Sequence, residues 1–180
     1  METKKSKKAT VITKNTIVSI LVLAITVLNF LALAFALVDA KQEFPSGTDR
    51  FFANGFTFVF GKCPVIIESY ENSLTFFSVC HLAVALILIA VLGIRFAVTK
   101  KANFGKFGIV SVIISAIFTI LYFVLGCIAY SEAVAYGGIG FGYDVNTFAF
   151  IPFAFMIMLV AAYVLVRVKL PKDYKREIKK

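Results

Sequence analysis

Four long stretches of the chain consist almost entirely of apolar residues, and polar or charged segments separate them. They cover residues 17–38, 74–98, 107–130 and 147–168. The first holds 22 residues without a formal charge. At the helical rise it reaches about 33 Å, which is enough to cross the hydrocarbon core of a bilayer. The pattern predicts an all-α membrane protein, an antiparallel bundle of four transmembrane helices.

Five polar segments flank these four predicted spans. Residues 1–16 form a basic leader, residues 99–106 a short basic connection and residues 169–180 a basic tail. Two longer segments, residues 39–73 and 131–146, lie on the other side of the predicted membrane, and the second is rich in glycine. The short basic connection predicts that the second and third helices are antiparallel neighbours.

Composition agrees with a membrane location. Hydrophobic residues make up 60% of the chain and charged residues only 16%. A soluble domain is nearer ~45–50% apolar. We therefore exclude an ordinary soluble domain.

The charges are distributed very unevenly over these segments. The leader, the short connection, the tail and the span ends next to them hold 16 of the 19 basic residues. By the positive-inside rule these segments are cytoplasmic, so both termini are predicted inside and the cell membrane is the predicted location. The formal net charge of +9 is therefore an orientation signal, and no nucleic-acid partner is predicted.

The first apolar run could also be a secretory signal cleaved after Ala40, because it follows a basic leader and ends at Val38-Asp39-Ala40. A signal peptide has an apolar core of only ~7–15 residues, which is shorter than this run. We expect the run to be retained as a membrane anchor.

Polar residues inside the spans are few. Asn29 lies near the middle of the first span, and Ser111, Ser115 and Thr119 repeat at four-residue spacing along the third. Residues four apart share one face of a helix, and small polar residues allow close helix packing. We expect these four residues to pack between helices; the alternative is that they line a path for a substrate or ion.

The loop at residues 39–73 is the candidate partner surface. The dipeptide Asn54-Gly55 is typical of a tight turn, and residues 56–60 partly alternate, which favours a short strand. The loop is predicted either to cap the bundle, with a possible short β-hairpin, or to lie in the membrane interface. Five aromatic residues would form the docking surface: Phe51, Phe52, Phe56, Phe58 and Phe60.

Basic residues next to the spans are candidates for contact with anionic lipid of the inner leaflet. Each such residue near the surface contributes ~1 kcal/mol of attraction. The candidates are Lys100, Lys101, Lys169, Lys172, Lys175 and Arg176.

Candidate chemistry is sparse, because no Asp, Glu or Lys lies inside the four runs. This argues against a proton relay or an ion-coupled transporter. The remaining constellation is Cys63, Cys80, His81 and Cys127, which contains no Cys-x-x-Cys pair. Unpaired packing residues are the favoured interpretation, and one disulfide or a thiol or metal centre are the alternatives. No cofactor is predicted.

The layout resembles that of claudin-type tetraspan proteins, with four spans, inside termini, a long first outer loop and a shorter second one. In that family the first loop carries a tryptophan motif and a cysteine pair. This chain has no Trp, and only Cys63 lies in the loop. The resemblance is therefore one of layout.

The favoured function is non-catalytic. The chain is expected to be an accessory subunit or a homo-oligomer that binds another membrane protein, or itself, through residues 39–73. An oligomeric channel or small transporter component is the first alternative, with Asn29, Ser111, Ser115 and Thr119 along a path. A membrane-embedded thiol or metal enzyme is the second.

Overall fold

The computed structural model describes the backbone of residues 10–44, 47–61, 68–99, 104–136, 141–143 and 147–178. The fold is mostly helical. Four helices are long and apolar enough to cross a membrane. They are α1 (Lys14–Ala32), α3 (Glu68–Thr99), α4 (Gly105–Tyr136) and α5 (Thr147–Lys169).

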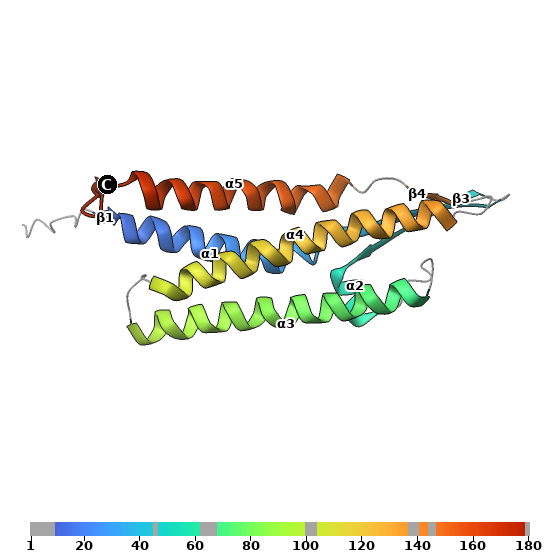
Figure 1. The fold of residues 1–180 in the computed structure, drawn as a ribbon, viewed down its shortest axis with the longest axis horizontal. Coiled ribbons are helices and arrows are strands. Elements are labelled where there is room, and N and C mark those ends of the chain that lie inside the picture. Colours follow the sequence, from blue (N-terminus) through green and yellow to red (C-terminus); the bar gives the residue numbers. More distant parts are fainter. Residues whose placement is uncertain are drawn as a thin grey trace, which may run out of the picture.

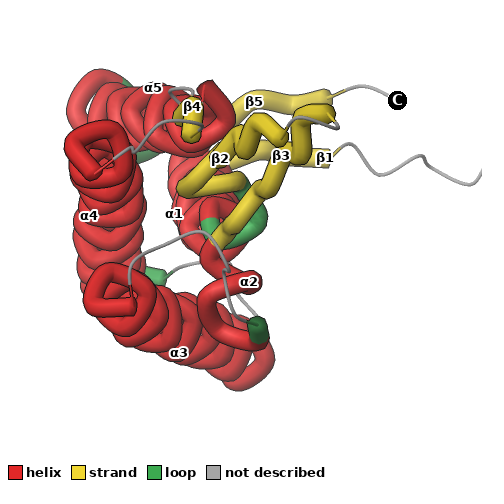
Figure 2. Tube along the Cα trace, turned by 90° about the vertical axis from the view of Figure 1, so that its right-hand side faces the viewer, coloured by secondary structure: helices red, strands yellow, loops and turns green. Residues whose placement is uncertain are grey.

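Helix α1 is the centre of the arrangement. It packs against α3, α4 and α5, and α3 and α5 lie on opposite sides of it (Figure 2). Successive long helices run in opposite directions (Figure 1). One face of α1 stays uncovered, and Ile20, Leu23, Val27 and Leu31 are exposed along it. The bundle is therefore a crescent of three helices around a fourth.

A small sheet and a short helix cover one end of the bundle, which we call the cap end. Strand β2 (Ala36–Phe44) pairs antiparallel with both β3 (Gly47–Asn54) and β4 (Phe141–Tyr143). Helix α2 (Gly55–Phe60) follows β3 directly and packs against α3. The cap thus joins two segments that are distant in sequence.

The other end, which we call the basic end, holds both ends of the described chain. Strand β1 (Thr10–Thr13) pairs antiparallel with β5 (Lys175–Ile178). The side chain of Thr13 then caps α1 by accepting a hydrogen bond from the backbone N–H of Thr16 at 3.3 Å. At the same end, the last turn of α5 contains Arg167 and Lys169. Their positive charges interact favourably with the negative end of the helix dipole.

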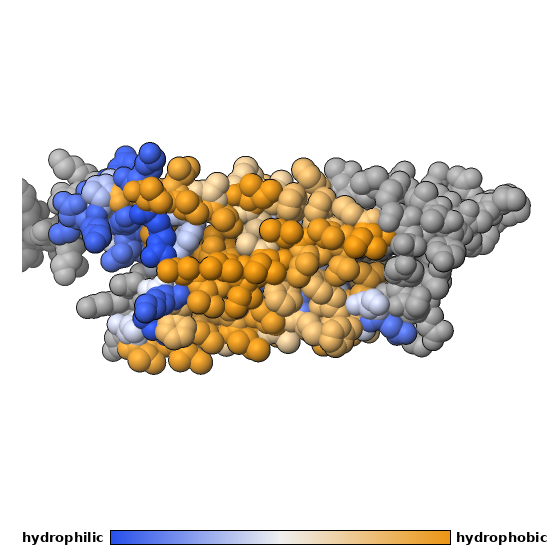
Figure 3. All heavy atoms as spheres, in the orientation of Figure 1, coloured by the Kyte–Doolittle hydropathy of each residue, from blue (hydrophilic) through white to orange (hydrophobic). Residues whose placement is uncertain are grey.

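The outer surface of the helices is apolar over most of their length. Large apolar side chains are exposed on all four, for example Ile20, Ile87, Ile113 and Met158. A space-filling view shows this apolar band, with hydrophilic residues gathered at the basic end (Figure 3). Soluble monomers rarely expose patches of this size, so lipid is the solvent of this surface.

Most of the buried apolar residues form two clusters, one at each end of the bundle. The cap-end cluster consists of Ala32, Leu33, Ala53, Phe58, Leu74 and Tyr122. The basic-end cluster consists of Val22, Ile25, Leu92, Phe104, Val112, Met156 and Tyr163.

The structure corrects the predicted end of the first span. Helix α1 ends at Ala32, six residues before the end of the predicted span at Val38, and residues from Ala36 onward form β2. Ala36 and Val38 pair with Asn54 and Ala53 of β3. An apolar run alone does not distinguish a helix from a buried strand. The hydropathy pattern therefore assigned α1 and the start of β2 to one span.

The predicted hairpin is present but is displaced along the chain. Its strands meet at Phe44 and Gly47, whereas the sequence placed the turn at Asn54-Gly55. Asn54 instead caps α2: its Oδ1 accepts a hydrogen bond from the backbone N–H of Thr57 at 2.9 Å. The Thr57 hydroxyl accepts one from the backbone N–H of Asn54 at 3.4 Å, which completes a capping box. Residues 56–60 are therefore helical, and the predicted strand there was wrong.

Candidate functional site

A line of buried polar side chains runs between α1, α3 and α4, and we call it the polar seam. All of its members are at most 1% exposed. It contains all four residues that the sequence singled out inside the spans. The members are Thr26, Asn29, Ser78, His81, Ser111, Ser115, Thr119 and Tyr122.

Asn29 is the residue at which three helices meet. The Nε2 of His81 lies 2.9 Å from the side-chain oxygen of Asn29 and 3.0 Å from its backbone carbonyl oxygen. The hydroxyl of Thr119 donates to the same side-chain oxygen at 3.3 Å. Both oxygens are acceptors, so Nε2 of His81 carries the proton and donates it. One amide therefore connects α1 to α3 and α4.

A second connection lies nearer the basic end. Thr26 and Ser111 are hydrogen-bonded through their hydroxyl oxygens at 2.8 Å. The Thr26 hydroxyl donates its single proton to the backbone carbonyl of Val22 at 2.9 Å, so Ser111 is the donor to Thr26. The face of α4 that carries Ser111 and Thr119 is thus bonded to α1 at two levels.

Some polar atoms of the seam have no hydrogen-bond partner within the described residues. They are the side-chain nitrogen of Asn29, Nδ1 of His81 and the hydroxyl oxygens of Ser78 and Ser115. Buried polar groups are normally paired, and each unpaired one costs about 1–3 kcal/mol. The seam therefore holds more donors and acceptors than its internal bonds use.

Aromatic rings enclose the seam on the side of His81. The imidazole ring lies within 5.3–5.8 Å, centroid to centroid, of Phe77, Phe118 and Tyr122. Two of these rings meet His81 edge to face, an arrangement that aromatic pairs favour. The rings keep the His81–Asn29 contact in an apolar setting.

Tyr122 connects the seam to the cap. Its hydroxyl accepts a hydrogen bond from the backbone N–H of Gly55 at 2.7 Å and donates one to the backbone carbonyl of Phe35 at 3.0 Å. It therefore holds the chain where α1 has ended and where α2 begins. The sequence analysis did not assign Tyr122 a role. The available signal was its position three residues after Thr119, on the same helical face.

The structure corrects part of the predicted Phe-rich docking surface. Phe58 is 1% exposed and belongs to the cap-end cluster, so it is a core residue. Phe56 packs against that cluster, with its ring 5.7 Å from Phe30. Phe60 is 77% exposed. Phe51 and Phe52 lie in β3, and their side chains are outside the description.

The candidate lipid-contact residues fall at several places. Lys169 and Lys172 are exposed at the end of α5 and just after it. Lys175 and Arg176 are exposed residues of β5, so part of the basic tail is a strand. Lys100 and Lys101 lie outside the described residues.

Cys80 and Cys127, the cysteines that the structure describes, form no disulfide with each other. Cys80 is half-buried and Cys127 is exposed, and both are free thiols. His81 turns to Asn29, and within the described part of the chain no group of three potential metal ligands is found. Cys63 lies outside the described residues.

The four apolar helices make the chain a multi-pass membrane protein. No protein-family model matches it, and comparisons with curated proteins and with solved structures find no match. A more specific function therefore has to be argued from the geometry of the seam, the cap and the basic end.

Proposed function

We propose that the chain is a non-catalytic protein of the cell membrane that works by binding another membrane protein or a second copy of itself. The observation that supports this proposal is that the polar seam residues form hydrogen bonds between the helices and to the cap. Asn29 and Thr26 accept hydrogen bonds from side chains of α3 and α4, and Tyr122 bonds to the start of the cap, all inside one copy of the chain. The polar groups of the spans thus serve to position the helices and the cap.

The proposed orientation places the basic end in the cytoplasm. Strands β1 and β5 bring the first and last described residues together at that end. The basic residues of the leader, the short connection and the tail support this side as the inner one. The cap then lies outside the cell and is the surface that a partner reaches.

The cap is suited to binding because it is an ordered surface held firmly to the bundle. Its sheet combines β2 and β3 with β4 from the second loop, and Tyr122 fixes the start of α2. Phe60 projects from the end of α2 as a large exposed apolar side chain. Exposed aromatic residues are typical anchors of protein interfaces.

The channel alternative receives less support from the seam. Ser111, Ser115 and Thr119 are buried on the face of α4 that is bonded to α1. A path between copies of the chain would need these residues on the outside of the bundle. Their burial supports helix packing.

The proposal is tested by replacing Phe60 with Ser and purifying the protein from its native membrane after cross-linking. We expect a loss of the cross-linked partner, or of the cross-linked dimer, of about 30-fold, because an aromatic anchor contributes ~2 kcal/mol or more and each 1.4 kcal/mol is tenfold. Phe76→Ser is the matched control, since Phe76 is 73% exposed but lies on α3. Equal partner recovery with Phe60→Ser and Phe76→Ser would rule out the cap as the binding surface.

A further inference from the structure

A cavity of about 420 Å³ lies at the basic end, between the starts of α1 and α4 and the end of α5. This volume is within the range of small-molecule sites, ~300–1,000 Å³. Three cationic residues line it, namely Lys14, Arg167 and Lys172, and no acidic residue is among its described lining residues. The carbonyls of Arg167 and Leu170 accept from Lys14, whereas the repulsion between the Arg167 and Lys172 side chains would be reduced by a bound anion.

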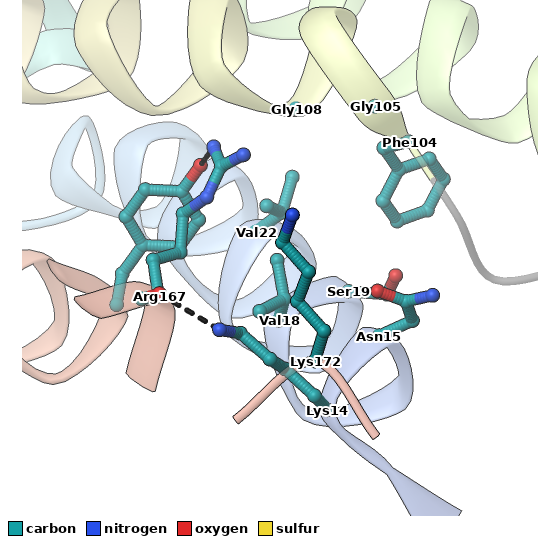
Figure 4. Close-up of a pocket in the computed structure, with 11 residues that line it drawn as sticks. Lys14, Asn15, Val18, Ser19, Val22, Phe104, Gly105, Gly108, Arg167 and Lys172 are labelled. Carbon is teal, nitrogen blue, oxygen red and sulfur yellow. Dashed lines mark hydrogen bonds between the residues drawn. The ribbon is translucent and has the colours of Figure 1, made fainter. Parts of the chain in front are cut away.

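The cationic groups converge from separate parts of the chain. Figure 4 shows the side chains of Lys172 and Arg167 extending into the same space beside α4, near Gly108. Arg167 comes from α5, and Lys172 comes from the segment after it. The start of α4 also lines the cavity, so the positive end of a 32-residue helix adds to its field.

Internal contacts hold two of the cations in place. One guanidinium nitrogen of Arg167 donates to the hydroxyl of Tyr163 at 2.7 Å, which leaves most of its donors for other acceptors. The ammonium of Lys14 donates to the backbone carbonyl of Arg167 at 2.8 Å. Lys172, by contrast, makes no hydrogen bond within the described part of the chain. The cavity thus has two positioned cations and one adaptable one.

We propose that this cavity binds a phosphate group. Phosphate is a strong acceptor that matches the donor fork of arginine and the ammonium of lysine. The wall also includes the polar residues Asn15 and Ser19. Its apolar part, with Val18, Val22 and Phe104, fits the glycerol and first acyl carbons of a phospholipid. The phosphate could belong to a lipid headgroup or to a free phosphate ion, because the cavity has both cationic and apolar lining residues.

The test uses the full-length protein purified in non-ionic detergent. Binding of phosphatidylglycerol, diacylglycerol and inorganic phosphate is measured by native mass spectrometry and by the midpoint of thermal unfolding. We expect phosphatidylglycerol to bind at least tenfold more tightly than diacylglycerol, which lacks the phosphate. If inorganic phosphate protects the protein to the same degree as the lipid, the ligand is free phosphate; if only the lipid protects, it is a headgroup.

Lys172→Gln is the informative variant, because Lys172 is exposed and its loss leaves the packed core intact. We expect it to weaken phosphate binding about tenfold. Lys169→Gln is the matched control, because Lys169 is an exposed cation at the same end that does not line the cavity. Equal weakening by both substitutions would show general attraction to the basic surface and overturn the proposal. Equal binding of phosphatidylglycerol and diacylglycerol would overturn it as well.

Discussion

At the scale of single residues, the fold depends on a few polar side chains placed where lipid offers no alternative partner. Asn29 is fully buried and accepts hydrogen bonds from His81 and Thr119. An amide in hydrocarbon is costly unless it is bonded, so its position selects one rotation and depth for α1 against α3 and α4. We infer that the polar seam contributes more to the specificity of helix packing than to the free energy of unfolding.

The Asn29–His81 contact predicts a measurable coupling energy. In a double-mutant cycle of Asn29→Ala and His81→Ala, we expect a coupling of about 0.6–1.7 kcal/mol, the range found for hydrogen bonds between membrane helices. The measurement is reversible unfolding in mixed micelles. The cycle of Asn29→Ala with Cys80→Ala is the control, because Cys80 precedes His81 on α3 and has no bond to Asn29 in the described structure. Equal coupling energies in the His81 cycle and the Cys80 cycle would show that Asn29 and His81 make no specific contact.

At the scale of elements, the cap and the bundle are joined by close backbone packing at the start of α2. A Cβ added at Gly55 would lie 3.0 Å from the Tyr122 hydroxyl and 3.2 Å from the Cα of Leu33. These distances leave no room for a side chain. Gly55 therefore allows α2 to approach both the end of α1 and helix α4.

Gly55→Ala is predicted to destabilise the protein by about 1–3 kcal/mol, because the cap must shift to admit the methyl group. The measurement is the unfolding free energy, together with hydrogen exchange of α2, which should become faster. Gly93→Ala is the control: nothing lies within 4 Å of a Cβ at Gly93, which lies within α3, six residues before its end at Thr99. That change should be neutral or stabilise by up to ~1 kcal/mol. A similar effect of both substitutions would show that α2 is not closely packed.

The sequence was informative about the helices and less so about the cap. Four long apolar runs are sufficient to predict helices that can span a membrane, since few other structures satisfy the backbone in lipid. The four-residue spacing of Ser111, Ser115 and Thr119 also located one face of α4 that the structure buries. The end of α1 and the hairpin were misplaced, because residues 36–38 are as apolar as the helix before them. Asn54-Gly55 suits both a turn and a helix start, and only the capping box with Thr57 decides between them.

At the scale of the whole molecule, the structure has an apolar middle and two different ends. The cap end carries a sheet and α2 (Figure 1). The basic end carries the paired strands β1 and β5 and a cationic cavity. The polar side chains of the spans turn toward one another between α1, α3 and α4. We propose that a protein built in this way uses its outer surfaces to bind partners and lipids, while its buried polar seam stays closed to water.

Cysteine accessibility shows whether water reaches the polar seam. In a background with Cys63, Cys80 and Cys127 replaced by Ser, single cysteines are placed at Ser111, Ser115 and Thr119 and treated with a water-soluble thiol reagent in native membranes. Cysteines at the exposed positions Phe60 and Lys172 are the positive controls. We predict labelling at the two control positions and none at the three seam positions. Labelling at Ser111, Ser115 and Thr119 would mean that water enters the bundle, and it would contradict the account in favour of a channel.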